Sequence, residues 1–359
     1  MPLSRLSRIL CLGFSLTLSN LTGTVQAAPI LVEAESFAEH GGWKLDTQFI
    51  EIMGSPYLLA HGMGQPVADA TTKVKIPTAG TYRIWARTKD WVAPFEAKGA
   101  PGKFGIKIDG KDLATTFCTI GAEWHWQPGG QVVLPAGEVD LALVDPTGFD
   151  GRCDAVLLSS DLAFVPDNTS DVLPAWRRQA LGLPEKAPVQ DGHDLVVVGG
   201  GYSGLGAAIS ASRMGLKVAL IQNRMVLGGN GSSEVRVWAM GNTPSGLYPV
   251  GDIIRELEDT ASASPAPYEE WEDAKKERIV RAEKNISLFL GHHAFGVEMK
   301  NEASIRSVMA LDTRSGEIVE FKAPQFVDCT GHGYVGMWAG ADRNMIDGGR
   351  MGMSNMRSY

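Results

Sequence analysis

The stretch that decides the fold of this 359-residue chain is residues 194–208, which read DLVVVGGGYSGLGAA. The apolar run at residues 195–198 predicts a buried strand of a parallel sheet, and the residues after the glycines predict a helix that ends at Gly215. A second apolar run at residues 217–221 completes a strand–helix–strand unit of about 30 residues. In this context the glycines indicate a dinucleotide-binding turn.

Each small residue of the turn has its own physical role. Gly199 permits the tight turn, and Gly201 lets a pyrophosphate approach the backbone at the positive N-terminus of the helix. Gly204 and Ala208 let the helix and the strand pack closely. The turn therefore predicts a bound dinucleotide.

Two later motifs extend this site. Residues 227–234, LGGNGSSE, follow the second strand almost at once, and residues 326–333, FVDCTGHG, form another expected strand that ends in a glycine turn. The second strand ends in Gln222 instead of the acid that commonly binds the ribose hydroxyls. An amide can still hydrogen-bond to a ribose, while Arg224 raises the alternative of a 2′-phosphate.

In order and spacing, the three motifs resemble the FAD-binding elements of glutathione-reductase-like flavoproteins. They most resemble a family of secreted FAD-dependent oxidoreductases, some members of which carry a xanthan-lyase-type label. The resemblance implies a Rossmann-type FAD-binding domain over residues 194–359, with non-covalent FAD as the cofactor and with no nicotinamide dinucleotide. It implies cofactor contacts from Gly199, Gly201, Gly204, Gln222, Arg224, Gly229, Asn230, Ser232, Ser233, Thr330 and Gly331. His332 stands where many relatives have Asp, and we assign no catalytic residue.

Between the motifs, the periodicity predicts helices over residues 252–260 and 268–284, followed by four strands between residues 286 and 321. Lys275 and Lys276 are expected on a solvated helix face. The chain stops soon after residues 351–356, a glycine- and methionine-rich stretch, so we expect the FAD-binding domain to be incomplete through truncation; the alternative is that the remainder is on another polypeptide. A flavin bound here is then expected to be held weakly.

Residues 29–165 have the pattern of an all-β sandwich. Residues 81–87 alternate with period two, which places Tyr82 and Ile84 on one face and Trp85 on the other, and Asp109-Gly110 predicts a hairpin turn. Four of the five tryptophans in this part suit either sugar rings or a core: Trp85, Trp91, Trp124 and Trp126. Because a turn cluster follows Trp124 and Trp126, we expect one of them to face outward.

Acidic residues indicate a cation site in the sandwich. Glu33 and Glu35 share one face of the first expected strand, and Asp154 lies in the last. Ca²⁺ prefers several such oxygens, although solvated acids on an edge strand are the alternative. The segments VEAESF (32–37), AGTYRIWARTKDW (79–91) and DPTGFDGRCDAVLLSSD (145–161) resemble calcium-dependent, galactose-binding-like carbohydrate-binding modules. That resemblance implies structural Ca²⁺ at Glu33, Glu35 and Asp154.

The N-terminus has the three parts of a secretory signal: basic residues, a short apolar run, and small residues before a cleavage site after Ala27. We therefore expect residues 1–27 to be a signal peptide and the protein to be secreted or periplasmic; an uncleaved anchor or a native helix is the alternative. Residues 166–193, rich in Pro and Asp, are the expected linker. Export makes disulfides permissible, and Cys118 and Cys153 could pair within the first domain, but spacing alone does not show it.

Composition narrows the classes of partner. The formal net charge of −8 argues against a nucleic-acid partner, and no apolar run reaches the length of a membrane span in the mature chain. Three functions remain open. The first is a secreted FAD-dependent oxidoreductase that acts on a carbohydrate or related extracellular metabolite. The second is a non-redox polysaccharide lyase or hydrolase that uses a dinucleotide, and the third is a carbohydrate-binding protein with an inactive flavoprotein domain. The sequence identifies no protein partner.

Overall fold

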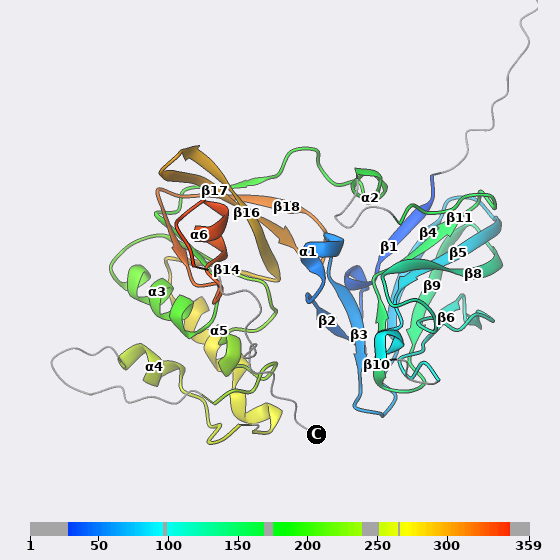
Figure 1. The fold of residues 1–359 in the computed structure, drawn as a ribbon, viewed down its shortest axis with the longest axis horizontal. Coiled ribbons are helices and arrows are strands. Elements are labelled where there is room, and N and C mark those ends of the chain that lie inside the picture. Colours follow the sequence, from blue (N-terminus) through cyan, green and yellow to red (C-terminus); the bar gives the residue numbers. More distant parts are fainter. Residues whose placement is uncertain (1–27, 96–98, 169–174, 239–250, 265, 345–359) are drawn as a thin grey trace, which may run out of the picture.

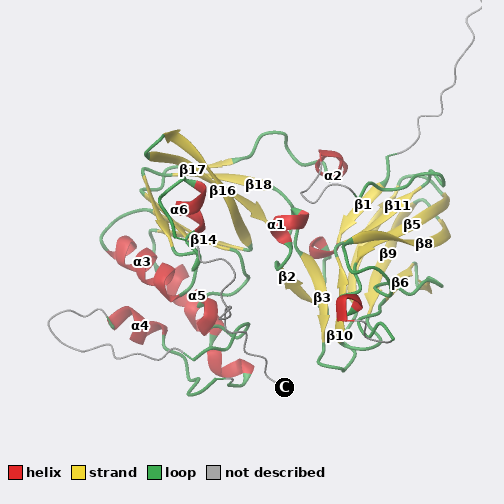
Figure 2. Ribbon diagram, viewed as in Figure 1, coloured by secondary structure: helices red, strands yellow, loops and turns green. Residues whose placement is uncertain are grey.

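The computed structural model describes residues 28–95, 99–168, 175–238, 251–264 and 266–344. Figure 1 shows two units that follow each other along the chain, the first drawn from blue to green and the second from green to red. Strands make up nearly all of the first unit, whereas the second combines strands with longer helices (Figure 2). The expected signal peptide and residues 351–356 lie outside the described residues.

The first unit consists of antiparallel sheets. One sheet has the order β1 (Ile30–Glu33), β11 (Ala155–Ser159), β5 (Gly80–Thr88), β8 (His125–Leu134). A second has the order β4 (Ala70–Ile76), β9 (Gly137–Val144), β6 (Gly105–Ile108), β7 (Lys111–Asp112), and a third the order β10 (Phe149–Cys153), β3 (Tyr57–His61), β2 (Lys44–Asp46). Short helical turns connect them: η1 (Ala34–Ser36), α1 (Ile50–Met53) and η2 (Ala93–Phe95).

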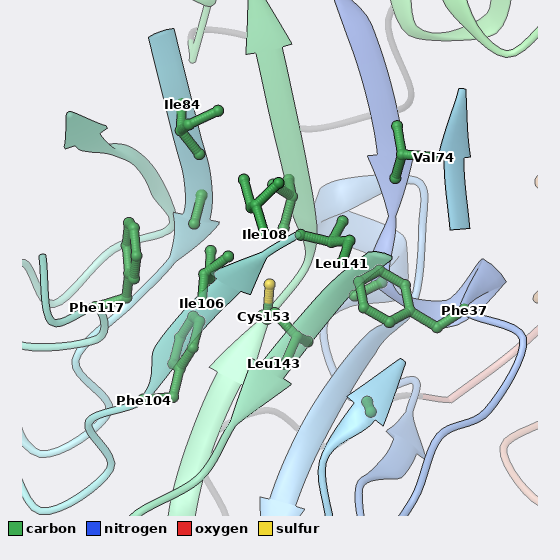
Figure 3. Packing of buried hydrophobic residues seen from close by; sticks show 14 of the residues in the cluster. Phe37, Val74, Ile84, Phe104, Ile106, Ile108, Phe117, Leu141, Leu143 and Cys153 are labelled. Carbon is green, nitrogen blue, oxygen red and sulfur yellow. The ribbon is translucent and has the colours of Figure 1, made fainter. Parts of the chain in front are cut away.

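The sandwich core forms where the sheets face each other (Figure 3). Ile84 of β5, Ile106 of β6 and Leu141 of β9 meet there with at most 1% of their surface exposed. Trp85 points to the opposite face of β5 and packs in a separate cluster with Leu31, as the period-two alternation predicts. Asp109 and Gly110, both with positive φ, make the tight turn between β6 and β7.

The second unit is an α/β layer structure. Its central sheet has the order β15 (Ile286–Leu290), β14 (Val218–Gln222), β13 (Leu195–Val198), β19 (Gln325–Asp328), with every pair parallel. One face packs against helices α3 (Tyr202–Arg213), α4 (Asp252–Leu257) and α5 (Asp273–Ala282). The described part of this unit also contains the short helices η3 (Gly229–Gly231), η4 (Tyr268–Trp271) and α6 (Tyr334–Trp338). The other face packs against a sheet of β12 (Val189–Gln190), β18 (Ile318–Lys322), β17 (Ser304–Asp312) and β16 (His292–Asn301). The predicted fold class, an all-β sandwich followed by a Rossmann-type domain, is confirmed.

The structure corrects one expectation about the sandwich and decides a pairing that the sequence leaves open. Trp124 and Trp126 are both only 7% exposed, so neither faces outward; Trp124 packs on Tyr57, and Trp126 joins the cluster of Trp85. The expected turn after them is not formed, because residues 127–130 lie inside β8 (His125–Leu134), and the large apolar area of both rings favours burial. Cys118 and Cys153 are buried free thiols, so the possible disulfide is not formed, and burial raises the pKa of each.

Of the helices that the structure describes, none has the length and apolar character to cross a bilayer. The short helix α2 (Ala175–Ala180) lies between the two units, in the segment 166–193.

Candidate functional site

The glycine turn lies at the carboxyl end of β13. A Cβ at Gly199, where φ is +106°, would lie 2.2 Å from the carbonyl oxygen of Cys329, and one at Gly204 would lie 1.7 Å from the carbonyl oxygen of Gly199. Gly201 differs, because its φ of −70° suits any residue and the nearest atom to a Cβ would be the Cα of Gly229, 3.9 Å away. The fold therefore requires glycine at 199 and 204, whereas Gly201 keeps space open before the N-terminus of α3.

The other two motifs converge on this turn. The Gly228 N–H donates to the Gly200 carbonyl at 2.8 Å, and a Cβ at Gly229 would lie 3.1 Å from the Cα of Gly201. On the other side, β19 runs parallel to β13, and the Cys329 N–H donates to the Val198 carbonyl at 2.8 Å. Three segments that are separate in the sequence thus meet at one edge of the parallel sheet, where α/β proteins bind ligands.

Thr330 and Gly331 follow β19 in a turn organised by Asp328, a residue that our sequence analysis did not single out. One oxygen of Asp328 accepts from the Thr330 N–H at 3.0 Å and its hydroxyl at 2.8 Å, and the other accepts from the Gly336 N–H at 3.0 Å. The Thr330 hydroxyl accepts from the Tyr334 N–H at 3.0 Å. An acid two residues before Thr-Gly is the signal that marks this turn.

Gln222 is buried, and both ends of its amide bond to the protein. Its Oε1 accepts from the Gly200 N–H at 2.8 Å, and its Nε2 donates to the Val226 carbonyl at 2.9 Å. The amide therefore braces the glycine turn through one accepted and one donated bond. Arg224 pairs with Glu234 at 3.6 Å and is more exposed.

The serines of the second motif are also held by the protein. The Ser232 hydroxyl donates to the Gly229 carbonyl at 2.7 Å. Ser233 bonds to Asp273 at the start of α5 through both its hydroxyl and its N–H, the latter at 3.1 Å. The Asn230 carbonyl accepts from the Val237 N–H at 2.9 Å. These bonds fix the loop that follows Gly228, and the cofactor contacts expected of these residues stay predictions.

A buried ion pair lies behind this loop. Lys276, expected on a solvated face, is fully buried; its ammonium lies 2.7 Å from Asp259 and also donates to the Trp271 carbonyl. A Cβ at Gly228 would lie 3.2 Å from the Lys276 side chain. The helical period alone cannot show this burial, because Asp259 and η4, which cover the side of α5 that carries Lys276, lie outside this helix.

Asp259 also lies close to Tyr202 at the start of α3. Burial and this neighbouring carboxylate raise the pKa of Tyr202.

In the sandwich, the three predicted metal ligands are brought together. Ligand oxygens of Glu33, Glu35 and Asp154 lie within 4.8 Å of one another, and all three residues are buried. Contrary to the sequence prediction, the two glutamates do not share one face of a strand, because β1 ends at Glu33 and Glu35 lies on η1. Burial and the two neighbouring carboxylates raise the pKa of Glu35 well above its usual range, and its Oε2 has no hydrogen-bond partner among the described residues.

Two arginines, which our sequence analysis did not foresee there, contact this acid cluster. Arg87 lies 3.0 Å from Asp154, and Arg177 of α2 forms a two-pronged ion pair with Glu33, with its Nε 3.0 Å from Oε1. Ser55 donates to the other oxygen of Asp154 at 2.9 Å. Nothing in the local sequence around residue 177 signals this contact across more than a hundred residues.

Residues 194–356 match the model of the family described as FAD dependent oxidoreductase. The α/β unit is an FAD-dependent oxidoreductase domain. The match takes in all three glycine motifs and confirms the expected family and cofactor. The open space beside Gly201, which is bordered by the backbone of Gly229, fits the diphosphate of such a cofactor.

Solved structures similar to the chain include carbohydrate-binding modules and a dehydrogenase. A family 35 carbohydrate binding module from Clostridium thermocellum is 16% identical and aligns with 37% of this chain and 98% of its own, at a TM-score of 0.30. The GH26-CBM35 β-(1,4)-mannanase of Podospora anserina is 16% identical over 55% of this chain and 51% of its own, at a TM-score of 0.30. L-proline dehydrogenase from P. horikoshii is 16% identical over 63% of this chain and 30% of its own, at a TM-score of 0.28. No curated protein matches the chain.

Proposed function

We propose that the chain is a secreted or periplasmic FAD-dependent oxidoreductase that acts on a carbohydrate or a related small extracellular metabolite. The observation that carries the proposal is the meeting of three glycine motifs at one edge of the parallel sheet. FAD bound there supplies hydride transfer. The chain positions it: Gly201 admits the diphosphate to the backbone, and the N-terminus of α3 offers N–H groups and partial positive charge.

The carbohydrate part of the proposal rests on the module-like sequence of residues 29–165 and on one aromatic pair. With Trp85, Trp124 and Trp126 buried, Trp91 is the member of the tryptophan set that remains for a sugar. Its ring lies parallel to that of Phe149, within 11° and with centroids 6.4 Å apart, and Phe149 is 45% exposed. We expect Phe149→Ala to weaken retention on polysaccharide, with the exposed Val133→Ala as a control that changes nothing.

We also propose Ca²⁺ as the structural cation of the acid cluster. The donors fit, because Ca²⁺ takes carboxylate oxygens at about 2.3–2.6 Å and oxygens within 4.8 Å of one another can surround one ion. The unpartnered Oε2 of Glu35 supports a further ligand for this oxygen. Glu33, Glu35 and Asp154 would hold the ion.

The test of the enzymatic proposal uses the full chain loaded with FAD and mixed with sugars and oligosaccharides without oxygen. A substrate should bleach the visible absorption of the flavin, and readmitted oxygen or another acceptor should restore it. Cleavage of a polysaccharide with no bleaching would support the lyase or hydrolase instead. Polysaccharide binding by a chain that takes up no FAD would support the inactive flavoprotein domain.

A further inference from the structure

Arg177 holds the place that a metal ion would take in the acid cluster. Its guanidinium bonds to both oxygens of Glu33, lies 3.4 Å from Asp154, and donates to the Ser55 hydroxyl at 3.3 Å. Arg177 is 3% exposed, so its charge lies among the carboxylates and away from water. An ion that uses the oxygens of Glu33 would have to displace this side chain.

The charges show that the arginine leaves the cluster open to a stronger cation. When all three carboxylates are ionised, Arg87 and Arg177 leave one negative charge unbalanced, whereas Ca²⁺ in the place of Arg177 leaves none. Neither arginine satisfies the Oε2 of Glu35. Ca²⁺ offers more ligand positions than one guanidinium and would satisfy this oxygen too.

Arg177 belongs to a segment that joins the two units. It lies on α2, and Leu181, just beyond that helix, packs on the cluster of Trp85 and Leu31. A few residues later β12 pairs with β18 in the FAD-dependent oxidoreductase domain. The connection therefore contacts the sandwich through α2 and the second unit through β12. Leu181 makes the apolar contact with the sandwich, and Arg177 makes the polar one.

We propose that Ca²⁺ and Arg177 compete for Glu33, Glu35 and Asp154, so that binding of Ca²⁺ releases α2 from the sandwich. This inference rests on the calcium site proposed above. Release of α2 lengthens the free connection ahead of β12 and widens the range of positions that the two units can take. The cation level then sets how tightly the sandwich and the oxidoreductase domain are tied.

The test compares the full-length wild type with Arg177→Gln and with Arg178→Gln. The second variant is the matched control, because Arg178 is the neighbouring arginine and its bond is to the Pro184 carbonyl outside the cluster. Calorimetry gives the Ca²⁺ affinity. Limited trypsin digestion gives the rate of cleavage after Arg177 and Arg178 in wild type, after Arg178 in Arg177→Gln and after Arg177 in Arg178→Gln. Wild type should be cleaved there at least about tenfold faster with Ca²⁺, because local opening exposes the segment.

Arg177→Gln should bind Ca²⁺ at least about tenfold more tightly than wild type, since no buried ion pair has to be displaced. Its cleavage should be fast without Ca²⁺, and EDTA should lower its melting temperature more than that of the control. A variant that folds only with Ca²⁺ would also support the competition. Equal affinity in wild type and Arg177→Gln, or Ca²⁺ binding to wild type with unchanged cleavage, would overturn it while the calcium site stands. Absence of Ca²⁺ binding in all three proteins would refute the calcium site itself.

Discussion

Gly201 is the position where cofactor binding can be separated from folding. A Cβ there has no protein atom closer than 3.9 Å, and φ −70° with ψ 178° is an ordinary conformation for alanine. Gly201→Ala should therefore change the free energy of unfolding by less than about 1 kcal/mol, because the lower entropy of the unfolded chain offsets a slightly poorer helix cap. The added methyl group would stand where the diphosphate has to approach the backbone.

The cost falls on FAD binding. Loss of one N–H bond to a charged phosphate costs about 1.5–3 kcal/mol, which weakens the affinity roughly 10- to 150-fold. Quenching of flavin fluorescence during titration gives the Kd, and thermal unfolding gives the stability. Gly206→Ala is the control on the same helix, since a Cβ there meets nothing within 4 Å; it should bind FAD normally and gain up to about 1 kcal/mol of stability. A folded Gly201→Ala protein with wild-type affinity would refute the placement of the diphosphate.

Three further predictions concern buried groups of the same domain. Lys276→Met should destabilise the protein by about 3–5 kcal/mol in denaturant unfolding, because it strands the buried Asp259, and adding Asp259→Asn should recover part of the loss; no recovery would mean that the pair is not the cause. Gln222→Glu should cost about 1–3 kcal/mol of stability, since a carboxylate oxygen would replace the donor to Val226; tighter FAD binding at unchanged stability would instead assign this residue to the ribose. Burial lowers the pKa of His293 to about 4 from 6.5, so the unfolded chain binds the proton first and stability should fall as pH drops from about 6.5 to about 4, by at most about 3 kcal/mol. His293→Phe should remove that slope from a pH series of unfolding curves, and an unchanged slope would show that other groups cause it.

Much of the architecture follows from the sequence because local rules determine it. Valines at 196–198 are buried on both faces of their strand, so the strand appears as a continuous apolar run before its glycine turn. The alternation of Tyr82, Ile84 and Trp85 assigns each side chain to a face before any partner strand is known. Each glycine motif follows an expected parallel strand. Because the carboxyl ends of parallel strands lie on the same side of a sheet, the three motifs are expected to lie close together.

Contacts between distant segments were beyond these rules. Arg177 neutralises Glu33 although 144 residues separate them, and neither local sequence shows the other. The helical pattern around Lys276 predicts a surface residue, whereas in the fold Lys276 is buried against Asp259. The Pro-Gly-Gly sequence after Trp126 has the composition of a turn, yet it lies inside β8, and both tryptophan rings are buried. Gln222 fits a ribose in the sequence, whereas in the fold its amide braces Gly200.

The most direct test of the account is reconstitution of the full chain with FAD, with NAD and NADP in parallel, followed by removal of free nucleotide. The three converging glycine motifs predict that the protein keeps FAD and shows a protein-bound flavin spectrum, and that Gly201→Ala holds FAD roughly 10- to 150-fold more weakly. A protein that stays colourless with FAD but retains a nicotinamide dinucleotide would contradict the account.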